Sequence, residues 1–169
     1  MDVRIRSLLS LIIAALLLAG CGFHLRGQVD LPFASAYVDS PATSPLTEPL
    51  KRSLRDAGKT VADKKEAAEI VIHLSQPSRA KNILSLSGAG KVAEYRLEYK
   101  VTMAVLNAQG EELLGSSEVQ LVRDLSYDDK YILAKEYEEA QLFQAMEQEV
   151  LQTLLRRLRF VKGGVTQTR

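Results

Sequence analysis

The sequence predicts an α+β fold, a single two-layer sandwich in which about four strands form a largely antiparallel or mixed sheet and two helices pack on one face. Two patterns predict it: strand-like alternation through the middle of the chain, and two segments of helical periodicity. The chain has 169 residues, of which 46% are hydrophobic and 25% are charged. This length and composition suit one globular domain with a single core.

Residues 1–20 are predicted to be a signal peptide. Arg4 and Arg6 precede an apolar run, residues 8–18. At about 1.5 Å per residue this run covers about 16 Å of helix, roughly half of the roughly 30 Å hydrocarbon core of a membrane. We therefore expect no stable membrane span here, and the run has the length of the apolar region of a signal peptide.

Cys21 is predicted to carry a covalent lipid. Leu18-Ala19-Gly20-Cys21 matches the bacterial lipobox, in which the cysteine thiol is joined to a diacylglycerol, and the chain has one cysteine. Gly22 follows it, instead of the aspartate that favours inner-membrane retention, so we expect the outer membrane as destination. Residues 21–31 are then a lipidated tether. Without residues 1–20, basic and acidic residues are equal in number, so acyl chains rather than net charge would hold the chain to a membrane.

The single domain, residues 32–160, is predicted to begin with a short strand at 34–39 and a helix at 46–57. The turn between them contains Pro41 and Pro45, which disfavour helical conformation in the residues before them. In the helix, apolar residues recur on one face, Pro49 lies in the first turn, and Gly58 suits the position after the last turn.

Three strand segments are expected next. Alternation at 70–75 can resume at 83–86 after a bend at Pro77. The clearest alternation covers 95–105, where Tyr99, Val101 and Met103 are expected to face the helices. A hairpin loop ending at Gly110 leads to a strand at 119–125.

A long helix is predicted at 134–159, followed by a disordered tail, 161–169. Its expected apolar face is formed by Leu133, Tyr137, Ala140, Phe143, Met146, Val150, Leu154 and Leu158. Glu136, Glu138 and Glu139 are expected in its first turn and Arg156, Arg157 and Arg159 in its last, where both sets complement the helix dipole.

The sequence offers no catalytic or metal site. A net charge of +1 argues against nucleic-acid binding, and one cysteine with two histidines excludes the usual zinc sites. The Gly88–Lys91 segment lacks the spacing of a phosphate-binding loop and is predicted to be a hairpin tip. His73 is expected on a sheet face, and Asp124, Asp128 and Asp129 are expected to precede and cap the long helix. We therefore expect no enzyme activity and no cofactor other than the lipid on Cys21.

The chain resembles the lipopolysaccharide-assembly lipoprotein family LptE of Gram-negative bacteria in three blocks. These are Cys21–Arg26 (CGFHLR), Ala93–Leu97 (AEYRL), and the helix that opens with Leu133-Ala-Lys135 and ends in Leu-Arg-Arg-Leu158. The resemblance implies an α+β lipoprotein with two helices and four strands. It further implies a plug for the outer-membrane β-barrel LptD that helps the barrel assemble, binds lipopolysaccharide, and is not an enzyme.

The resemblance also suggests Lys91 and Lys135 as lipopolysaccharide-binding residues. Some family members have an arginine in the loop before the AEYRL block, and Lys91 is the nearest cation here, offset from that position. Lys135 matches the family's lysine at the start of the last helix more closely. Sugar phosphates favour lysine or arginine at a loop tip, although both lysines could equally be ordinary solvated residues.

Two other functions stay open from the sequence. One is an accessory lipoprotein of a different envelope lipid-transport system of the ABC type. The other is a membrane-anchored enzyme such as a hydrolase, which the absence of a recognisable catalytic motif disfavours.

Overall fold

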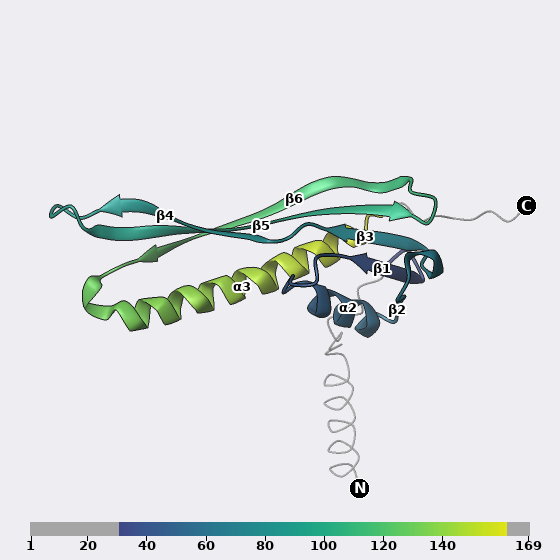
Figure 1. Cartoon of the computed structure of the whole chain (residues 1–169), viewed down its shortest axis with the longest axis horizontal. Helices are drawn as coiled ribbons and strands as arrows, with labels where there is room; N and C mark the ends of the chain where they lie inside the picture. Colours follow the sequence, from purple (N-terminus) through teal and green to yellow (C-terminus); the bar gives the residue numbers. More distant parts are fainter. Residues whose placement is uncertain (1–30, 162–169) are drawn as a thin grey trace, which may run out of the picture.

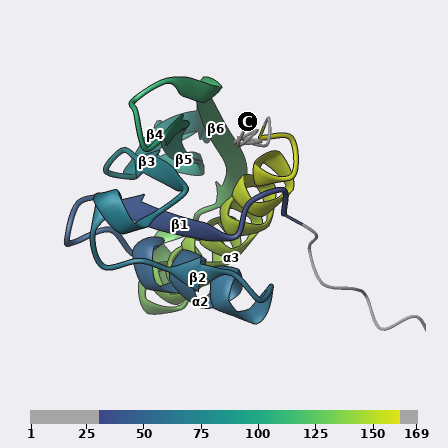
Figure 2. The same cartoon turned by 90° about the vertical axis from the view of Figure 1, so that its right-hand side faces the viewer.

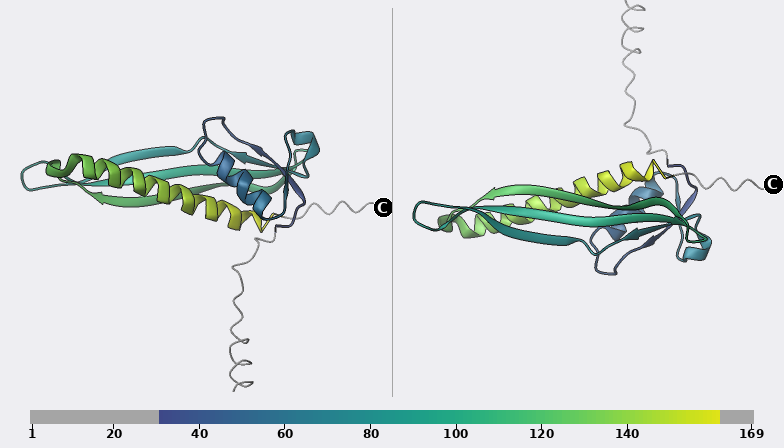
Figure 3. Two further views of the ribbon diagram at one scale, coloured as in Figure 1. Left: turned by 90° about the horizontal axis from the view of Figure 1, so that it is seen from below. Right: turned by 90° about the horizontal axis from the view of Figure 1, so that it is seen from above.

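The protein is an elongated two-layer structure. The computed structural model describes residues 31–161, and the sheet lies on one side with α2 and α3 both on the other (Figures 1 and 3). The predicted two-layer α+β architecture is therefore confirmed. In chain order the elements are β1 (Ser35–Asp39), α2 (Thr47–Asp56), β2 (Thr60–Val61), the 3-10 helix η1 (Lys65–Ala67), β3 (Ile70–Leu74), β4 (Ser78–Leu86), β5 (Val92–Asn107), β6 (Glu112–Ser126), the 3-10 helix η2 (Asp129–Tyr131) and α3 (Ile132–Leu158).

Six strands, instead of about four, form one mixed sheet in the described part of the chain. Their order is β2-β1-β3-β5-β4, and β6 pairs with the opposite edge of β5. β1 is parallel to β2 and β3, whereas β5 is antiparallel to β3, β4 and β6. The two strands beyond the prediction are the two-residue β2 and β4, which is separate from β3.

β3 and β4 follow the same edge of β5, one after the other. β3 pairs with residues 103–107 of β5 and β4 with residues 92–100. Between the two ladders, Ser75 N–H donates to Thr102 O at 2.9 Å. The segment from Leu74 to Ser78 there has one residue more than the segment of β5 opposite it, from Lys100 to Met103. Proline has no N–H to donate to a neighbouring strand, so the ladder is interrupted at Pro77. The predicted bend is confirmed.

The alternation in β5 builds the core. Its helix-facing side chains are all 1% exposed or less: Leu97, Tyr99, Val101, Met103 and Val105. Against them pack buried leucines of α2 and the buried face of α3: Leu50, Leu54, Met146, Val150, Leu154 and Leu158. The intervening polar residues of β5 lie on the helix-free face of the sheet, which we call the open face. The prediction for Tyr99, Val101 and Met103 is correct.

α2 ends as the sequence predicts. Gly58 has a φ of 75°, a conformation that glycine adopts without a Cβ clash. Its N–H donates to Arg55 O at 2.8 Å, and Lys59 N–H donates to Leu54 O at 2.9 Å, which is the Schellman arrangement that satisfies the last carbonyls of a helix. Pro49 lies within the first turn.

The start of α3 differs from the prediction. The helix begins at Ile132, and its first turn contains no acidic residue, so Glu136, Glu138 and Glu139 lie beyond it. The reason is η2, which runs directly into α3. Asp128 accepts the Lys130 N–H at 2.9 Å. It therefore caps η2, and not α3 as predicted. Arg156 and Arg157 lie in the last turn as expected.

The apolar face of α3 is buried only over the second part of the helix. Leu133 is 81% and Tyr137 is 68% exposed, contrary to the prediction, and the first buried residue of the helix is Phe143. The reason lies in the strand opposite. The first part of α3 meets β4, which has no buried residue, through the ion pair of Lys81 with Glu139, and this polar contact buries no apolar side chain of the helix.

Two residues predicted to lie outside the domain are part of its core. Leu31 was expected in the tether and Val161 in the tail, but both are buried in the core at 2% and 3% exposure.

β6 is longer than the predicted strand at 119–125, because the weakly patterned residues from Glu112 onward continue the ladder with β5. Residues 1–30, including Cys21, and residues 162–169 lie outside the described part of the chain.

Replacing Val101 with aspartate should destabilise the fold. Val101 is 1% exposed, and an unpaired carboxylate there should cost about 3 kcal/mol or more of the free energy of unfolding. Thr102→Asp, on the open face of the same strand, is the matched control and should cost about 1 kcal/mol or less. Denaturant unfolding of both variants tests this, and equal losses would mean that the buried face of β5 is wrongly assigned.

Candidate functional site

The described residues offer no cluster suited to metal binding. No group of three or more histidine, cysteine, aspartate or glutamate residues in this part of the chain could hold an ion. His73 lies on the open face, as predicted, with Nδ1 2.7 Å from Asp39 Oδ2. None of the helices between residues 31 and 161 is long and apolar enough to span a membrane.

The predicted site residues Lys91 and Lys135 lie at the same end of the molecule. We call this end the tip and define it as the β4–β5 turn (87–91), the connection from β6 to α3 (127–131) and the first turn of α3 (132–135). Figure 1 shows the turn and the start of α3 together at one end, and Figure 2 views the molecule from the other. The sequence suggests the two lysines separately, and the fold brings them to the same end of the molecule, where their side chains have different partners.

Lys91 lies in the β4–β5 turn and contacts the connection before α3. Gly90, with a φ of 74°, closes the turn, which confirms the predicted hairpin tip. The Lys91 Nζ donates to Asp129 Oδ2 at 3.0 Å. This hydrogen bond, together with the charge of Asp129, raises the pKa of Lys91. The lysine therefore stays protonated, and its 70% exposed side chain can exchange this partner for another anion.

Lys135 is held more firmly. Its Nζ donates to Ser126 Oγ at 3.0 Å and to Glu138 Oε2 at 2.8 Å, and its side chain is only 18% exposed. The lysine thus ties the first turn of α3 to the end of β6. An anion at the tip would be attracted less by Lys135 than by Lys91, because Glu138 already neutralises part of the charge of the less exposed Lys135.

Lys130 is a third cation of the tip, which the sequence analysis did not single out. It is exposed, and it makes no ion pair within residues 31–161. It lines a hollow of about 320 Å³ together with Lys91, Tyr127 and two carboxylates, those of Asp128 and Asp129. The sequence signal for it was weak, because a lone lysine beside Asp128 and Asp129 looks like ordinary helix-capping sequence.

Exposed apolar side chains surround these cations. Ile83 and Leu86, near the end of β4, are 60% and 59% exposed, and Tyr131, Ile132 and Leu133, where α3 starts, are 62%, 45% and 81% exposed. Such a concentration of large exposed apolar residues at one end marks an interaction surface. The tip therefore combines lysines, two of them paired with carboxylates, with apolar surface, and an amphipathic anion can bind there by replacing those carboxylates.

The aromatic pair of Tyr95 and Tyr127 packs at the tip. The rings of Tyr95 and Tyr127 meet edge to face with centroids 5.1 Å apart. The Lys81 Nζ lies 4.3 Å from the Tyr95 ring centroid and pairs with Glu139 of α3. These contacts join β4, β5, the connection and α3, and so fix the positions of the lysines.

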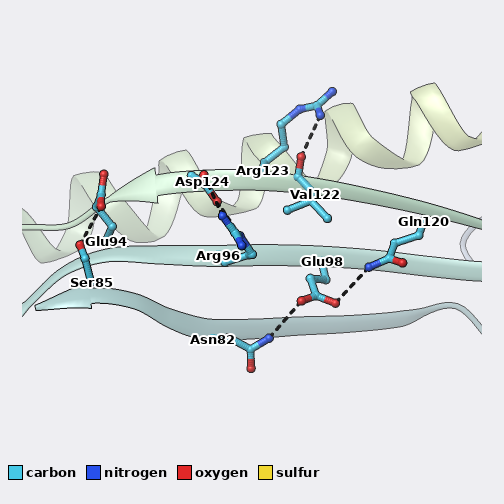
Figure 4. A network of polar contacts seen from close by, with 9 residues as sticks. All are labelled: Asn82, Ser85, Glu94, Arg96, Glu98, Gln120, Val122, Arg123 and Asp124. Carbon is cyan, nitrogen blue, oxygen red and sulfur yellow. Dashed lines mark hydrogen bonds and ion pairs between the residues drawn. The ribbon is translucent and has the colours of Figure 1, made fainter.

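The open face of the sheet is a paired polar surface (Figure 4). Arg96 donates to Asp124 at 3.0 Å and 3.4 Å, and this partner raises the pKa of Arg96. Glu98 accepts from Asn82 at 3.5 Å and from Gln120 at 3.4 Å. A surface of this kind suits contact with a polar, hydrated partner.

Comparison with known families gives one match over most of the chain. Residues 28–158 match the family described as LptE, Lipopolysaccharide-assembly. The LPS-assembly lipoprotein LptE of Pectobacterium atrosepticum is 30% identical over 156 residues, covering 90% of this chain and 84% of that protein. The LPS-assembly lipoprotein LptE of Photorhabdus laumondii is 31% identical over 160 residues, covering 92% of this chain and 86% of that protein.

Two solved structures of lipoproteins are similar to this chain in fold and in sequence. The NMR structure of an uncharacterized lipoprotein B from Nitrosomonas europaea superposes with a TM-score of 0.72 at 36% identity, covering 82% of this chain and 90% of that chain. The crystal structure of the rare lipoprotein B from Shewanella oneidensis has a TM-score of 0.65 at 26% identity, covering 73% of this chain and 92% of that chain. Both similarities extend over most of the domain.

Proposed function

The chain belongs to the LptE family of lipopolysaccharide-assembly lipoproteins, and we propose that it plugs the outer-membrane β-barrel LptD, helps that barrel assemble, and binds lipopolysaccharide during its insertion into the outer leaflet. Membership of the family makes it a lipoprotein of the cell envelope with a role in lipopolysaccharide assembly. The barrel partner, the outer-membrane location and the contact with lipopolysaccharide are the finer parts of the proposal. The proposal includes no catalytic activity.

The tip carries the proposal of lipopolysaccharide binding. Lipid A and the inner sugars present phosphates beside acyl chains, and the tip presents Lys91 and Lys130 beside Ile132 and Leu133. Lysine binds phosphate as a point charge, and the exposed apolar side chains would be covered by acyl chains. This juxtaposition of cations and apolar surface is the observation on which the proposal depends.

The shape and the open face support the role of a plug. The molecule is long and narrow in every view of Figures 1 and 3, as an insert for a barrel lumen must be. The interior of a wide membrane barrel is polar. The open face, with Arg96 bonded to Asp124 and Glu98 bonded to Gln120, would present hydrogen-bonded polar groups to such a lumen.

The anchor completes the proposal. We propose that Cys21 carries the lipid and that its acyl chains hold the protein at the periplasmic side of the outer membrane. Several acyl chains on one residue exceed the marginal binding of a single chain. The folded domain would then sit within the barrel, with the tip at the end that meets lipopolysaccharide.

The partner is tested by co-purification. The full-length chain with an affinity tag, expressed in its native host, should retain LptD at a ratio near one to one after detergent extraction. Retention of an inner-membrane ABC complex instead, with no β-barrel, would contradict the barrel partner and favour the alternative lipid-transport system.

The tip is tested by lipopolysaccharide binding. The variant Lys91→Gln/Lys130→Gln/Lys135→Gln should bind purified lipopolysaccharide about ten-fold more weakly, since three partly exposed charge contacts together contribute about 1.4 kcal/mol. Salt should weaken binding by the unmodified protein, because it screens such contacts.

The matched control removes the same charge far from the tip. The variant Lys51→Gln/Lys64→Gln/Lys65→Gln, on α2 and around η1, should bind as the unmodified protein does. Equal binding by both triple variants at every salt concentration would remove Lys91, Lys130 and Lys135 from the site.

A further inference from the structure

We propose that the free edge of β4 binds an extended segment of a partner protein, which adds to the sheet as a further strand. β4 pairs with β5 on one side only, and its nine residues are exposed or partly exposed along their whole length. The proposal rests on the proposed function in one respect: LptD is taken as the source of the segment.

Three residues of β4 direct their backbone N–H and C=O groups away from the sheet. Ser75 N–H donates to Thr102 O, so Thr102 and every second residue of β5 direct their backbone groups toward β3 and β4. The β4 residues opposite these positions are even-numbered, as the pair Ser78 and Lys100 shows, and they bond to β5. The outward groups therefore belong to the residues between them, which are Arg79, Lys81 and Ile83.

Side chains bond to two outward carbonyls at the edge of β6, and the edge of β4 differs in this respect. Arg157 of α3 donates to the outward carbonyl of Glu118 at 3.0 Å, and Arg123 donates to that of Val122 at 2.9 Å, a contact that Figure 4 shows. Among the described residues, no side chain bonds to the backbone of β4. Proteins normally cover or break long exposed edge strands because they pair with other chains. In β4 the ladder is regular from Ser78 to Ile83 and shifts register after Ile83, so the edge that a partner strand could pair with is this regular part, with Arg79, Lys81 and Ile83 directed outward.

A groove runs beside this edge. It has a volume of about 560 Å³ and lies between Arg79 and Lys81 of β4 and four residues of α3: Glu136, Glu139, Ala140 and Phe143. Alternate side chains of a strand point to the same face. A strand added to β4 would therefore place every second side chain in this groove, against α3, which is the arrangement of peptide binding between a strand edge and a helix.

The charge of β4 defines the chemistry of the partner. The strand contains Arg79 and Lys81 and no acidic residue. Their side chains are 50% and 33% exposed despite their ion pairs with α3, so each can accept a second carboxylate. Directly opposed residues of neighbouring strands favour opposite charge. Glu136 and Glu139 also line the groove. The partner segment should therefore have hydrogen-bond acceptors such as Asn, Gln or a single carboxylate opposite Arg79 and Lys81, and an apolar residue opposite the 60% exposed Ile83. A second copy of β4 would place the cations of the two strands against each other, which is unfavourable.

The test compares two substitutions at one position. Lys81→Ala and Lys81→Pro both remove the ion pair with Glu139, but only proline removes the outward N–H. Because that N–H does not bond to β5, both variants should fold with similar melting temperatures. In native cells, Lys81→Ala should retain LptD within about two-fold of the unmodified chain, and Lys81→Pro should retain about ten-fold less. In the unmodified complex, hydrogen–deuterium exchange of β4 should be slower than in the isolated chain.

The outcomes separate this inference from the proposed function. If the unmodified chain retains LptD and the two variants retain it equally, strand addition is wrong while the barrel partner stands. Equal exchange of β4 in the isolated chain and in the complex would overturn it in the same way. Slow exchange of β4 amides in the isolated chain would mean that the chain itself already covers this edge, and would overturn the proposal. If the exchange rate falls as protein concentration rises, a second copy covers it instead. If the unmodified chain retains no LptD, both the proposed function and this partner are wrong.

Discussion

The pairing of β5 with three other strands is the interaction on which the rest of the structure depends. β5 pairs with β3 and β4 along one edge and with β6 along the other, and its buried row from Leu97 to Val105 receives both helices. A shift of one residue in β5 would turn this whole row to the open face, because strand side chains alternate. The register of this single strand therefore fixes the core, the position of α3 and the position of the tip.

The two parts of α3 are held by different forces. From Phe143 to Leu158 the helix is held by buried apolar side chains. Before Phe143, apart from the partly buried Leu142, the helix contacts the sheet through polar side chains, namely the pair of Lys81 with Glu139 and the bond of Lys135 to Ser126. Apolar burial stabilises more per side chain than an exposed ion pair does. The first part of α3 is therefore the less stable part, and the apolar residues that it leaves exposed are available to a ligand or a partner.

Sequence reasoning succeeded where a local pattern determines the structure. The alternation of β5, the glycine end of α2 and the bend at Pro77 each depend on a few neighbouring residues, and all three were predicted correctly. It failed where the outcome depends on a distant segment. Leu133 and Tyr137 have helical spacing, but only the neighbouring β4 decides that they stay exposed. The tip shows the same limit, because Lys91 and Lys130 are far apart in sequence and meet only through the fold.

The division of α3 is the central claim, and amide hydrogen exchange along the helix in the isolated mature chain tests it most directly. Residues 143–158 should exchange slowly, at a rate that added salt leaves unchanged, because apolar packing protects them. Residues 136–142 should exchange faster, and faster still in high salt, because exposed ion pairs are screened. Uniform, salt-independent protection from residue 136 to residue 158 would contradict the account, since it would mean that the whole helix is held by the core.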